Sequence, residues 1–294
     1  MQLKIVQLKA ALNSAINQLS EAKVPSPRMN AEILLMFALG CDRAYLYAHP
    51  ERELTEDENH RYTEAVSQRA SGIPAQYITG HQEFWGMDLI VSSAVLIPRP
   101  ETEHLVETVL EIVSARTADG AVDSVKKIRI VDVGTGSGSI ALALATELPW
   151  AEIHATDISF AALEIARANA ARHQLESRVQ FRENDLLAGF EINSFDIVVS
   201  NPPYVGESEE DQVQMEVRRF EPRNAVFAGP TGTEVIVELI SQARTVVNPG
   251  GWLVMEISGT IAKRVEELLT DWEQIRVIND LQGIARVVAA RKAF

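Results

Sequence analysis

The chain has 294 residues, of which 46% are hydrophobic, so it is long enough for about two domains and can bury a sizeable core. Its 41 acidic residues outnumber 27 basic ones and give a net charge of −14, which argues against direct nucleic-acid binding and favours a basic protein partner. Cys41, the only cysteine, excludes an internal disulfide or cysteine-based zinc cluster, and without an apolar run of roughly 18 residues we expect a soluble, cytoplasmic protein with no membrane span.

Residues 1–73 are predicted to form a small, all-helical domain. Ser26, which precedes a proline, is typical of a helix N-cap, and Gly40 is typical of a helix end. Thr55 and Glu58 have the spacing of a capping box and predict the start of a long helix. No candidate catalytic cluster lies here, so we interpret the region as a packing or partner-recognition module. The expected helices span residues 3–20, 27–40 and 56–71.

A different composition begins at residue 74. Aromatic and β-branched residues flank Gly86 within residues 74–97, which predicts a β-hairpin linker. Pro100, followed by two acidic residues, is typical of the first turn of a helix. We therefore place the second domain at residues 98–294, with a polar loop at residues 117–127.

Strand and helix patterns alternate through the second domain, which predicts an α/β fold with a mostly parallel sheet. A polar, acidic loop is expected at residues 206–221 and a turn at residues 248–251. The expected strands span residues 128–133, 152–156, 178–182, 195–200 and 252–257, with two more at the C-terminus; the helices span 139–148, 159–173, 233–247 and 262–272.

The first of these strands runs directly into Gly134-Thr135-Gly136-Ser137-Gly138 and a helix, an order typical of nucleotide binding. Asp157 follows the second strand, where its carboxylate can accept hydrogen bonds from two ribose hydroxyls. An NAD-dependent dehydrogenase shares these features, but its fingerprint needs Gly or Ala where Ser139 stands. S-adenosylmethionine has no pyrophosphate and needs only close backbone approach, so the loop favours this cofactor.

The fourth strand stops at Asn201-Pro202-Pro203-Tyr204, because prolines lack the N–H that a sheet or helix would use. The side-chain carbonyl of Asn201 and the main-chain carbonyl of Pro202 are two acceptors that can hold a planar NH₂ group, and Tyr204 supplies a flat wall. The alternative interpretation is that Asn-Pro-Pro merely ends a strand.

Together, Asp132-Val133-Gly134-Thr135-Gly136-Ser137-Gly138 and Asn201-Pro202-Pro203-Tyr204 resemble class I S-adenosylmethionine-dependent methyltransferases that act on an amino group bound to a planar system. The segments Ile97-Pro98-Arg99-Pro100-Glu101-Thr102-Glu103 and Glu221-Pro222-Arg223 resemble the bacterial release factor glutamine N5-methyltransferases, the PrmC/HemK family. The likeness covers nearly the whole chain. It implies a Rossmann-like methyltransferase domain that methylates the glutamine in the Gly-Gly-Gln loop of class I peptide chain release factors and so modulates translation termination.

The resemblance also implies roles for the motif residues. An amide nitrogen is a poor nucleophile, so two acceptors that orient its lone pair toward the methyl group would replace a strong base, and the product would be S-adenosylhomocysteine. The six histidines show no ligand spacing, so no metal is expected. The implied cofactor-binding residues are Gly134, Thr135, Gly136, Ser137, Gly138, Asp157, Asp185, Leu186 and Asn201; the substrate-binding residues are Asn201, Pro202, Pro203 and Tyr204, of which Asn201, Pro202 and Tyr204 are catalytic.

Three alternatives remain open from the sequence. A nucleic-acid adenine N6-methyltransferase would share the tetrapeptide but would need a basic groove, which the negative charge disfavours. A ribosomal-protein glutamine N5-methyltransferase is closer, but that family has Ser after the Pro-Arg, where this chain has Pro100. A cofactor-binding scaffold without activity would leave the acceptor pair at Asn201 unexplained.

Overall fold

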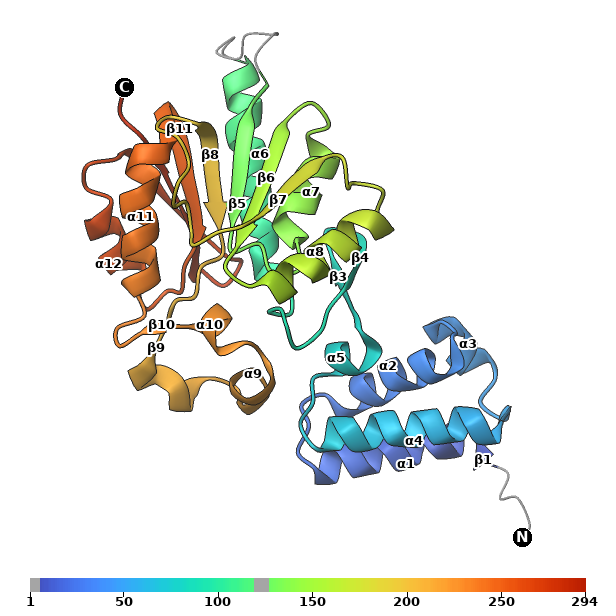
Figure 1. Cartoon of the computed structure of the whole chain (residues 1–294). Coiled ribbons are helices and arrows are strands. Elements are labelled where there is room, and N and C mark those ends of the chain that lie inside the picture. The colour runs from blue at the N-terminus through green and yellow to red at the C-terminus, as the bar shows by residue number, and fades with distance from the viewer. Residues whose placement is uncertain (1–5, 119–126) are drawn as a thin grey trace. The chain divides into compact units, whose positions relative to one another are not determined.

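The computed structural model describes residues 6–118 and 127–294, and these fold into two compact units (Figure 1). The first unit contains the described residues up to His81 and also Met215–Phe220. The second contains Gln82–Gln214 and Glu221–Phe294. The expected loop at residues 117–127 lies largely outside the described residues. None of the described helices is both long and apolar enough to cross a membrane.

The first unit is a bundle whose core is formed by buried side chains of its three long helices and the segments between them. The helix end at Gly40 and the capping box of Thr55 and Glu58 are confirmed. Ser26 occupies the N-cap position, but its side chain does not cap the helix, and the first helix begins at Leu8 rather than at residue 3. The elements are β1 (Val6–Gln7), α1 (Leu8–Glu21), α2 (Pro27–Leu39), α3 (Arg43–Ala48), β2 (Glu53–Leu54), α4 (Glu56–Ala70), α5 (Ala75–Thr79) and α9 (Met215–Phe220).

Two features of this unit differ from the expectation. The short strands β1 and β2 pair antiparallel, so the unit is not purely helical. Helix α9 lies within the segment expected to be a loop, and the ion pair between Arg69 and Glu216, at 2.6 Å, ties it to α4. Arg69 is buried and also donates to Asn30. Because this contact joins residues 147 positions apart, local sequence patterns do not predict it.

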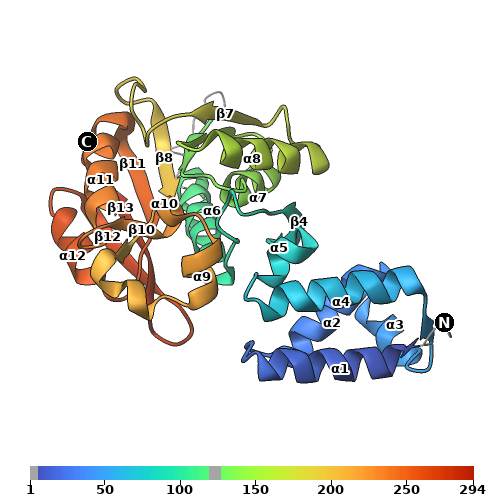
Figure 2. The same cartoon turned by 60° about the horizontal axis from the view of Figure 1, so that its bottom comes forward.

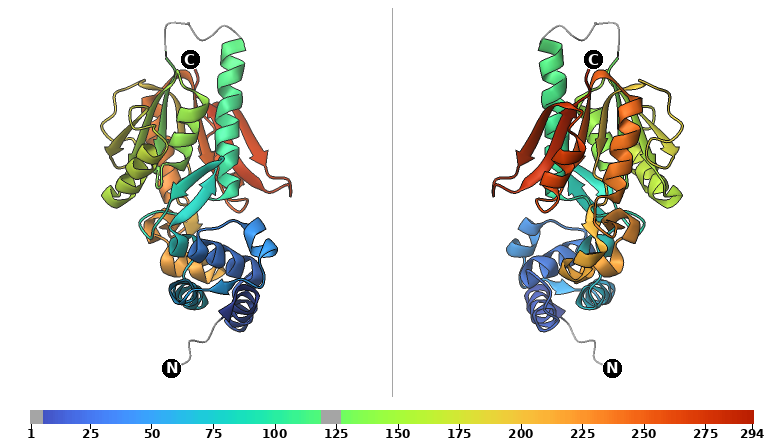
Figure 3. Two further views of the ribbon diagram at one scale, coloured as in Figure 1. Left: turned by 90° about the vertical axis from the view of Figure 1, so that its right-hand side faces the viewer. Right: turned by 90° about the vertical axis from the view of Figure 1, so that its left-hand side faces the viewer.

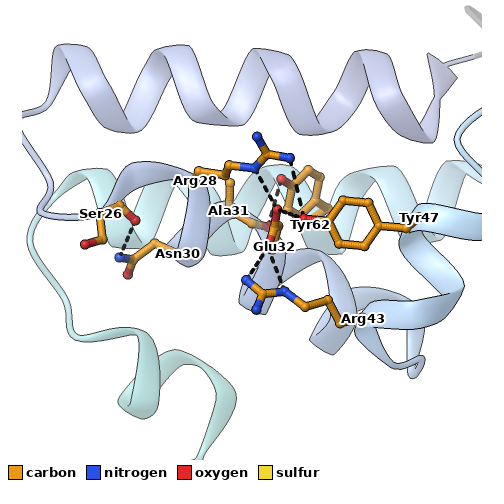
Figure 4. A network of polar contacts seen from close by, with 8 residues as sticks. All are labelled: Ser26, Arg28, Asn30, Ala31, Glu32, Arg43, Tyr47 and Tyr62. Carbon is orange, nitrogen blue, oxygen red and sulfur yellow. Dashed lines mark hydrogen bonds and ion pairs between the residues drawn. The ribbon is translucent and has the colours of Figure 1, made fainter.

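A buried carboxylate organises the polar side of α2 and α3 (Figure 4). Glu32 accepts hydrogen bonds from Arg28 Nε and Arg43 Nε, both at 2.9 Å, and from the Tyr47 hydroxyl at 2.8 Å. Burial alone would raise the pKa of Glu32, but these three partners hold it below the usual value. The network therefore stabilises the ionised form of a side chain that is only 1% exposed.

The second unit contains a seven-stranded sheet in the order β12-β13-β11-β8-β5-β6-β7, in which β13 runs opposite to the other strands. The predicted mostly parallel α/β fold is confirmed. The strands are β5 (Arg129–Val133), β6 (Glu152–Asp157), β7 (Val179–Glu183), β8 (Phe195–Ser200), β11 (Val247–Glu256), β12 (Glu273–Asn279) and β13 (Ala285–Arg291); the helices are α6 (Glu103–Ala118), α7 (Ser139–Glu147), α8 (Phe160–Arg172), α10 (Arg223–Val226), α11 (Glu234–Val246) and α12 (Ala262–Leu268).

Helices cover both faces of this sheet (Figure 3). Ile130 and Ile197 pack into a core with α6 and α7, whereas the next residues, Val131 and Val198, pack into a second core with α11 and α12. Successive side chains of a strand point to opposite faces, so a strand that is apolar at every position must be covered on both sides. This explains why β5 and β8 appear in the sequence as continuous apolar runs.

The predicted hairpin forms from β3 (His81–Phe84) and β4 (Met87–Ile90), joined by Trp85 and Gly86, but the first part of the expected linker forms helix α5 instead. Both joining residues have positive φ, as the favoured two-residue hairpin turn requires. The fully buried side chain of Asn169 then binds the main chain of Ile90 through both its oxygen and its nitrogen. The same amide nitrogen donates to Ser137 O at 2.9 Å, so Asn169 links the hairpin to the glycine loop.

Two loop predictions are wrong in detail. The expected loop at residues 206–221 contains the 3-10 helix η2 (Glu207–Gln212) as well as α9, and β9 (Val205–Gly206) pairs in parallel with β10 (Phe227–Gly229). Residues 248–251 form an irregularity inside β11 rather than a turn before it, because Val247 already pairs with Phe195 of β8. A 3-10 helix, η1 (Pro100–Thr102), precedes α6 where the sequence predicts a helix start.

Candidate functional site

A cavity of about 500 Å³ lies at the carboxyl ends of β5, β6, β7 and β8, the end of the sheet that Figure 2 brings toward the viewer. Strand order reverses between β5 and β8, and the crevice at such a reversal is where open parallel sheets bind ligands. A volume in this range suits a small molecule of cofactor size. The cavity lies entirely within the second unit.

The glycine loop forms one wall of this cavity. Gly134 and Gly136 have φ of +72° and +56°, which side chains with a Cβ rarely adopt. A Cβ built on either residue would meet no atom within 4 Å, so the space beside the loop is open. Gly138 differs, since its Cβ would lie 3.2 Å from Ala166 Cβ, and this glycine serves the packing of α7 against α8.

Asp132 supports the loop from beneath. Its Oδ2 accepts hydrogen bonds from the Thr135 hydroxyl at 2.6 Å and from Ala141 N at 3.2 Å, while Oδ1 has no partner among the described residues. Complete burial raises the pKa of Asp132 to about 7. The carboxyl group therefore joins the loop to the first turn of α7.

Asp157, at the end of β6, lines the same cavity. Its two oxygens accept main-chain hydrogen bonds from Gly136 N and Ser159 N, both at 2.9 Å, so the carboxylate is held in one orientation beside the loop. Burial raises its pKa above the usual value, although these hydrogen bonds act in the opposite direction. Each oxygen keeps a lone pair with which to accept a ligand hydroxyl.

Asp185 and Leu186 follow β7 and also line the cavity. Leu186 has a left-handed backbone, with φ of +49°. Its carbonyl accepts hydrogen bonds from Asn184 Nδ2 at 3.0 Å and from the Thr156 hydroxyl at 3.3 Å. These bonds fix an unusual turn that carries both residues to the cavity wall.

Asn201 and Pro203, which follow β8, form another part of the wall. The last strand residue is anchored by a hydrogen bond from the Ser200 hydroxyl to Val133 O at 2.7 Å. Asn201 Nδ2 donates to Thr102 Oγ1 at 3.1 Å, and the hydroxyl of Tyr204 donates to Glu256 Oε1 at 3.2 Å. Burial and the neighbouring carboxylate raise the pKa of Tyr204, so the phenol stays protonated.

The cavity thus brings together most of the residues singled out from the sequence. Three of them, Gly138, Pro202 and Tyr204, are not among the described residues that line it. The ones that do line it are Gly134, Thr135, Gly136, Ser137, Asp157, Asp185, Leu186, Asn201 and Pro203.

Comparison with known proteins gives family matches along the chain. The PrmC N-terminal domain matches residues 10–80, and the methyltransferase small domain matches residues 119–220. The release factor glutamine methyltransferase of Koribacter versatilis is 54% identical, over 97% of this chain and 98% of that protein. The chain belongs to the release factor glutamine methyltransferase family.

Other members of the release factor glutamine methyltransferase family are also similar along their length. The protein from Rhodopirellula baltica is 40% identical over 91% of this chain and 90% of its own. Among solved structures, the catalytic domain of hMettl16 in complex with a MAT2A 3′UTR hairpin has a TM-score of 0.56 at 15% identity, with 85% of this chain and 92% of that chain covered. This last likeness shows the class I methyltransferase fold alone.

Sequence reasoning missed three polar residues at this site. Glu221 accepts from Ile97 N at 3.1 Å and pairs with Arg99, which lines the cavity. Thr102, which also lines the cavity, accepts from Asn201 and donates to Glu256. Thr102 and Glu221 stand within segments that carried the family resemblance, but without an assigned role. Glu256, an acid at the end of the apolar run of β11, is a signal that could have been noticed.

Proposed function

We propose that this chain transfers a methyl group from S-adenosylmethionine to the side-chain amide nitrogen, N5, of the glutamine in the Gly-Gly-Gln motif of class I peptide chain release factors. The observation that carries the proposal is identity of 54% over 97% of the chain with a release factor glutamine methyltransferase. The position of Asn201 on the wall of a cofactor-sized cavity supports it.

The residues around the cavity fit S-adenosylmethionine, which when bound supplies an electrophilic methyl group on a sulfonium. The open space beside Gly134 and Gly136 admits close approach to the main chain. The oriented carboxylate of Asp157 is suited to accept hydrogen bonds from two ribose hydroxyls. We assign the adenine contacts to Asp185 and Leu186, which follow β7 and line the cavity. We assign the remaining cofactor contacts to Thr135, Ser137 and Asn201, which line the cavity, whereas Gly138 would support the loop through its packing against α8.

For the substrate, we propose that Asn201 Oδ1 and the main-chain carbonyl of Pro202 accept the two N–H bonds of the glutamine amide. The amide would then present its lone pair toward the methyl group, which removes the need for a strong base. Pro203 would confine the amide, and Tyr204 would bound the substrate position. The amide nitrogen would gain the methyl group as its bond to sulfur breaks, one amide hydrogen would leave as a proton to solvent, and S-adenosylhomocysteine would be the other product.

We further propose that residues 1–73 form a recognition domain, residues 74–97 a linker, and residues 98–294 the methyltransferase domain. The compact units of the structure differ somewhat from these proposed domains, because the first unit extends to His81 and also includes Met215–Phe220. The net charge of −14 favours a basic surface on the release factor. We place the reaction in the cytoplasm, without a metal ion.

The direct test is incubation of the purified protein with a class I release factor and isotope-labelled S-adenosylmethionine. Mass spectrometry of the peptide that contains Gly-Gly-Gln should show one added methyl group on the glutamine. A release factor with this glutamine replaced by alanine is the control and should remain unlabelled. Labelling of a ribosomal protein, with the release factor unmodified, would instead support the related glutamine methyltransferase activity.

A further inference from the structure

A continuous series of hydrogen bonds begins at Asn201. Asn201 Nδ2 donates to Thr102 Oγ1 at 3.1 Å, and the Thr102 hydroxyl donates to Glu256 Oε2 at 2.7 Å. The other oxygen of Glu256 accepts from the Tyr204 hydroxyl at 3.2 Å. Thr102 and Glu256 are each only 3% exposed, so water does not replace these partners readily. The residues come from β8 and its following loop, η1 and β11.

The direction of each bond follows from the carboxylate at one end. An ionised carboxylate has no hydrogen to donate, so both hydroxyls that contact Glu256 must donate to it. The single hydrogen of the Thr102 hydroxyl is then committed to Glu256, and Thr102 Oγ1 can only accept from Asn201. Asn201 must therefore present its NH₂ group to Thr102, which leaves the carbonyl oxygen Oδ1 directed elsewhere.

We infer that Glu256 is a positioning residue, which acts through Thr102 to fix the Asn201 side chain with its acceptor oxygen available to the substrate amide. The inference rests on the proposed function, because it assumes that Asn201 Oδ1 accepts a substrate N–H. If the amide of Asn201 were reversed, it would present a donor to a substrate group that also donates. Such a contact is repulsive and would displace the substrate nitrogen from its position for transfer.

The charges around Glu256 bear on its ionisation. Burial raises its pKa, the hydrogen bonds from Thr102 and Tyr204 act against this, Glu101 of η1 raises it further, and Arg286 of β13 lowers it. When Glu256 takes up a proton, it can donate to Thr102, and the Thr102 hydroxyl is then free to donate to Asn201 Oδ1. Acidification would thus allow the reversed, unproductive orientation. Activity should fall as the pH drops through the raised pKa of Glu256.

The test compares three threonine variants of the full chain. Thr102→Val removes the hydroxyl and should lower kcat by about 10-fold to 100-fold, with little change in cofactor Kd. Thr102→Ser keeps the hydroxyl and should retain most of the activity. Thr108→Val is the matched control, because Thr108 is an equally buried threonine of α6 whose hydroxyl donates to the His104 carbonyl and lies outside this series, and its kcat should be unchanged.

Glu256→Gln provides an independent measurement if Thr102→Val fails to fold. Wild-type kcat, measured with saturating cofactor and release factor, should decrease at acidic pH, and the decrease should be absent in Glu256→Gln, because the glutamine side chain does not titrate and keeps an oxygen that can accept from Thr102. Equal kcat for Thr102→Val and Thr102→Ser, or an unchanged acidic decrease in Glu256→Gln, would overturn the inference while wild-type methylation still supported the proposed function. If the wild-type protein itself left the release factor unmethylated, the proposed function would fail first.

Discussion

Replacing Asn201 with alanine removes the acceptor that the proposed mechanism places against the substrate amide. In the structure this side chain contributes to the cavity wall, and its Nδ2 donates a hydrogen bond to Thr102 at 3.1 Å. Losing one positioned polar group from a transition state typically costs a factor of 10² to 10³ in kcat, or about 2.7 to 4 kcal/mol. We therefore expect methyl transfer by Asn201→Ala to be about 10²-fold slower or worse.

Cofactor affinity should change much less in this variant. The glycine loop is held by Asp132, and Asp157 is held by main-chain N–H groups of Gly136 and Ser159, so neither depends on Asn201. Single-turnover transfer of labelled methyl to the release factor gives the rate, and calorimetric titration with S-adenosylhomocysteine gives the affinity. A slow variant that still binds cofactor would place the defect in the transfer step.

Asn201→Asp tests whether an acceptor oxygen at position 201 is enough for activity, because it keeps the acceptor that Asn201→Ala removes. Aspartate keeps an acceptor of nearly the same shape, but it cannot donate to Thr102 when it is ionised. It should retain more activity than Asn201→Ala if an acceptor at this position is what matters. Turnover of Asn201→Ala near the wild-type rate would refute the mechanism, and Asn201 would then serve only to end β8.

Three further predictions concern the cofactor site and stability. Asp157→Ala should weaken S-adenosylmethionine binding by about 1.5 to 3 kcal/mol, because it removes charge-assisted hydrogen bonds; unchanged affinity in calorimetric titration would mean that the ribose lies elsewhere. Gly138→Ala should lower the thermal unfolding midpoint, since φ is +84° and the new Cβ would approach Ala166, whereas an unchanged midpoint would contradict the packing role. Glu32→Gln should lower the free energy of unfolding by about 1 to 3 kcal/mol near neutral pH. Because the folded-state pKa of Glu32 is lowered, this contribution to stability is present above the usual glutamate pKa and is lost as the pH falls through the folded-state pKa. The free energies of unfolding of the wild type and Glu32→Gln, measured by denaturant titration, should therefore converge in acid. A difference that stays constant with pH would count against the ionised network.

Local sequence patterns predicted the parts of the fold that depend on neighbouring residues. The capping box at Thr55 and Glu58, the helix end at Gly40 and the hairpin turn at Gly86 each follow from a few adjacent side chains. The loop at residues 206–221 was predicted less well. Its helix α9 is only six residues long, and its pairing with Arg69 depends on a distant part of the chain.

The candidate site divides in the same way. Strand ends followed by Gly134, Asp157 and Asn201 could be recognised because parallel strands bring their carboxyl ends to one edge of the sheet. The absence of Tyr204 and Gly138 from the cavity wall could not be recognised from the sequence, because it depends on how distant elements pack. The Tyr204 hydroxyl bonds to Glu256, and Gly138 packs against α8.

By itself, the sequence determined the α/β class, the order of strands and helices, and the motifs that end the strands, because hydrophobic periodicity and turn residues act over a few positions. Only the tertiary structure decided which polar groups form hydrogen bonds with the residues of those motifs. Thr102 is 99 residues from Asn201 and 154 residues from Glu256, yet the three side chains form one series of hydrogen bonds. These three side chains come into contact because η1, β8 and β11 pack together, and a local sequence pattern does not specify contacts between residues so far apart in the chain.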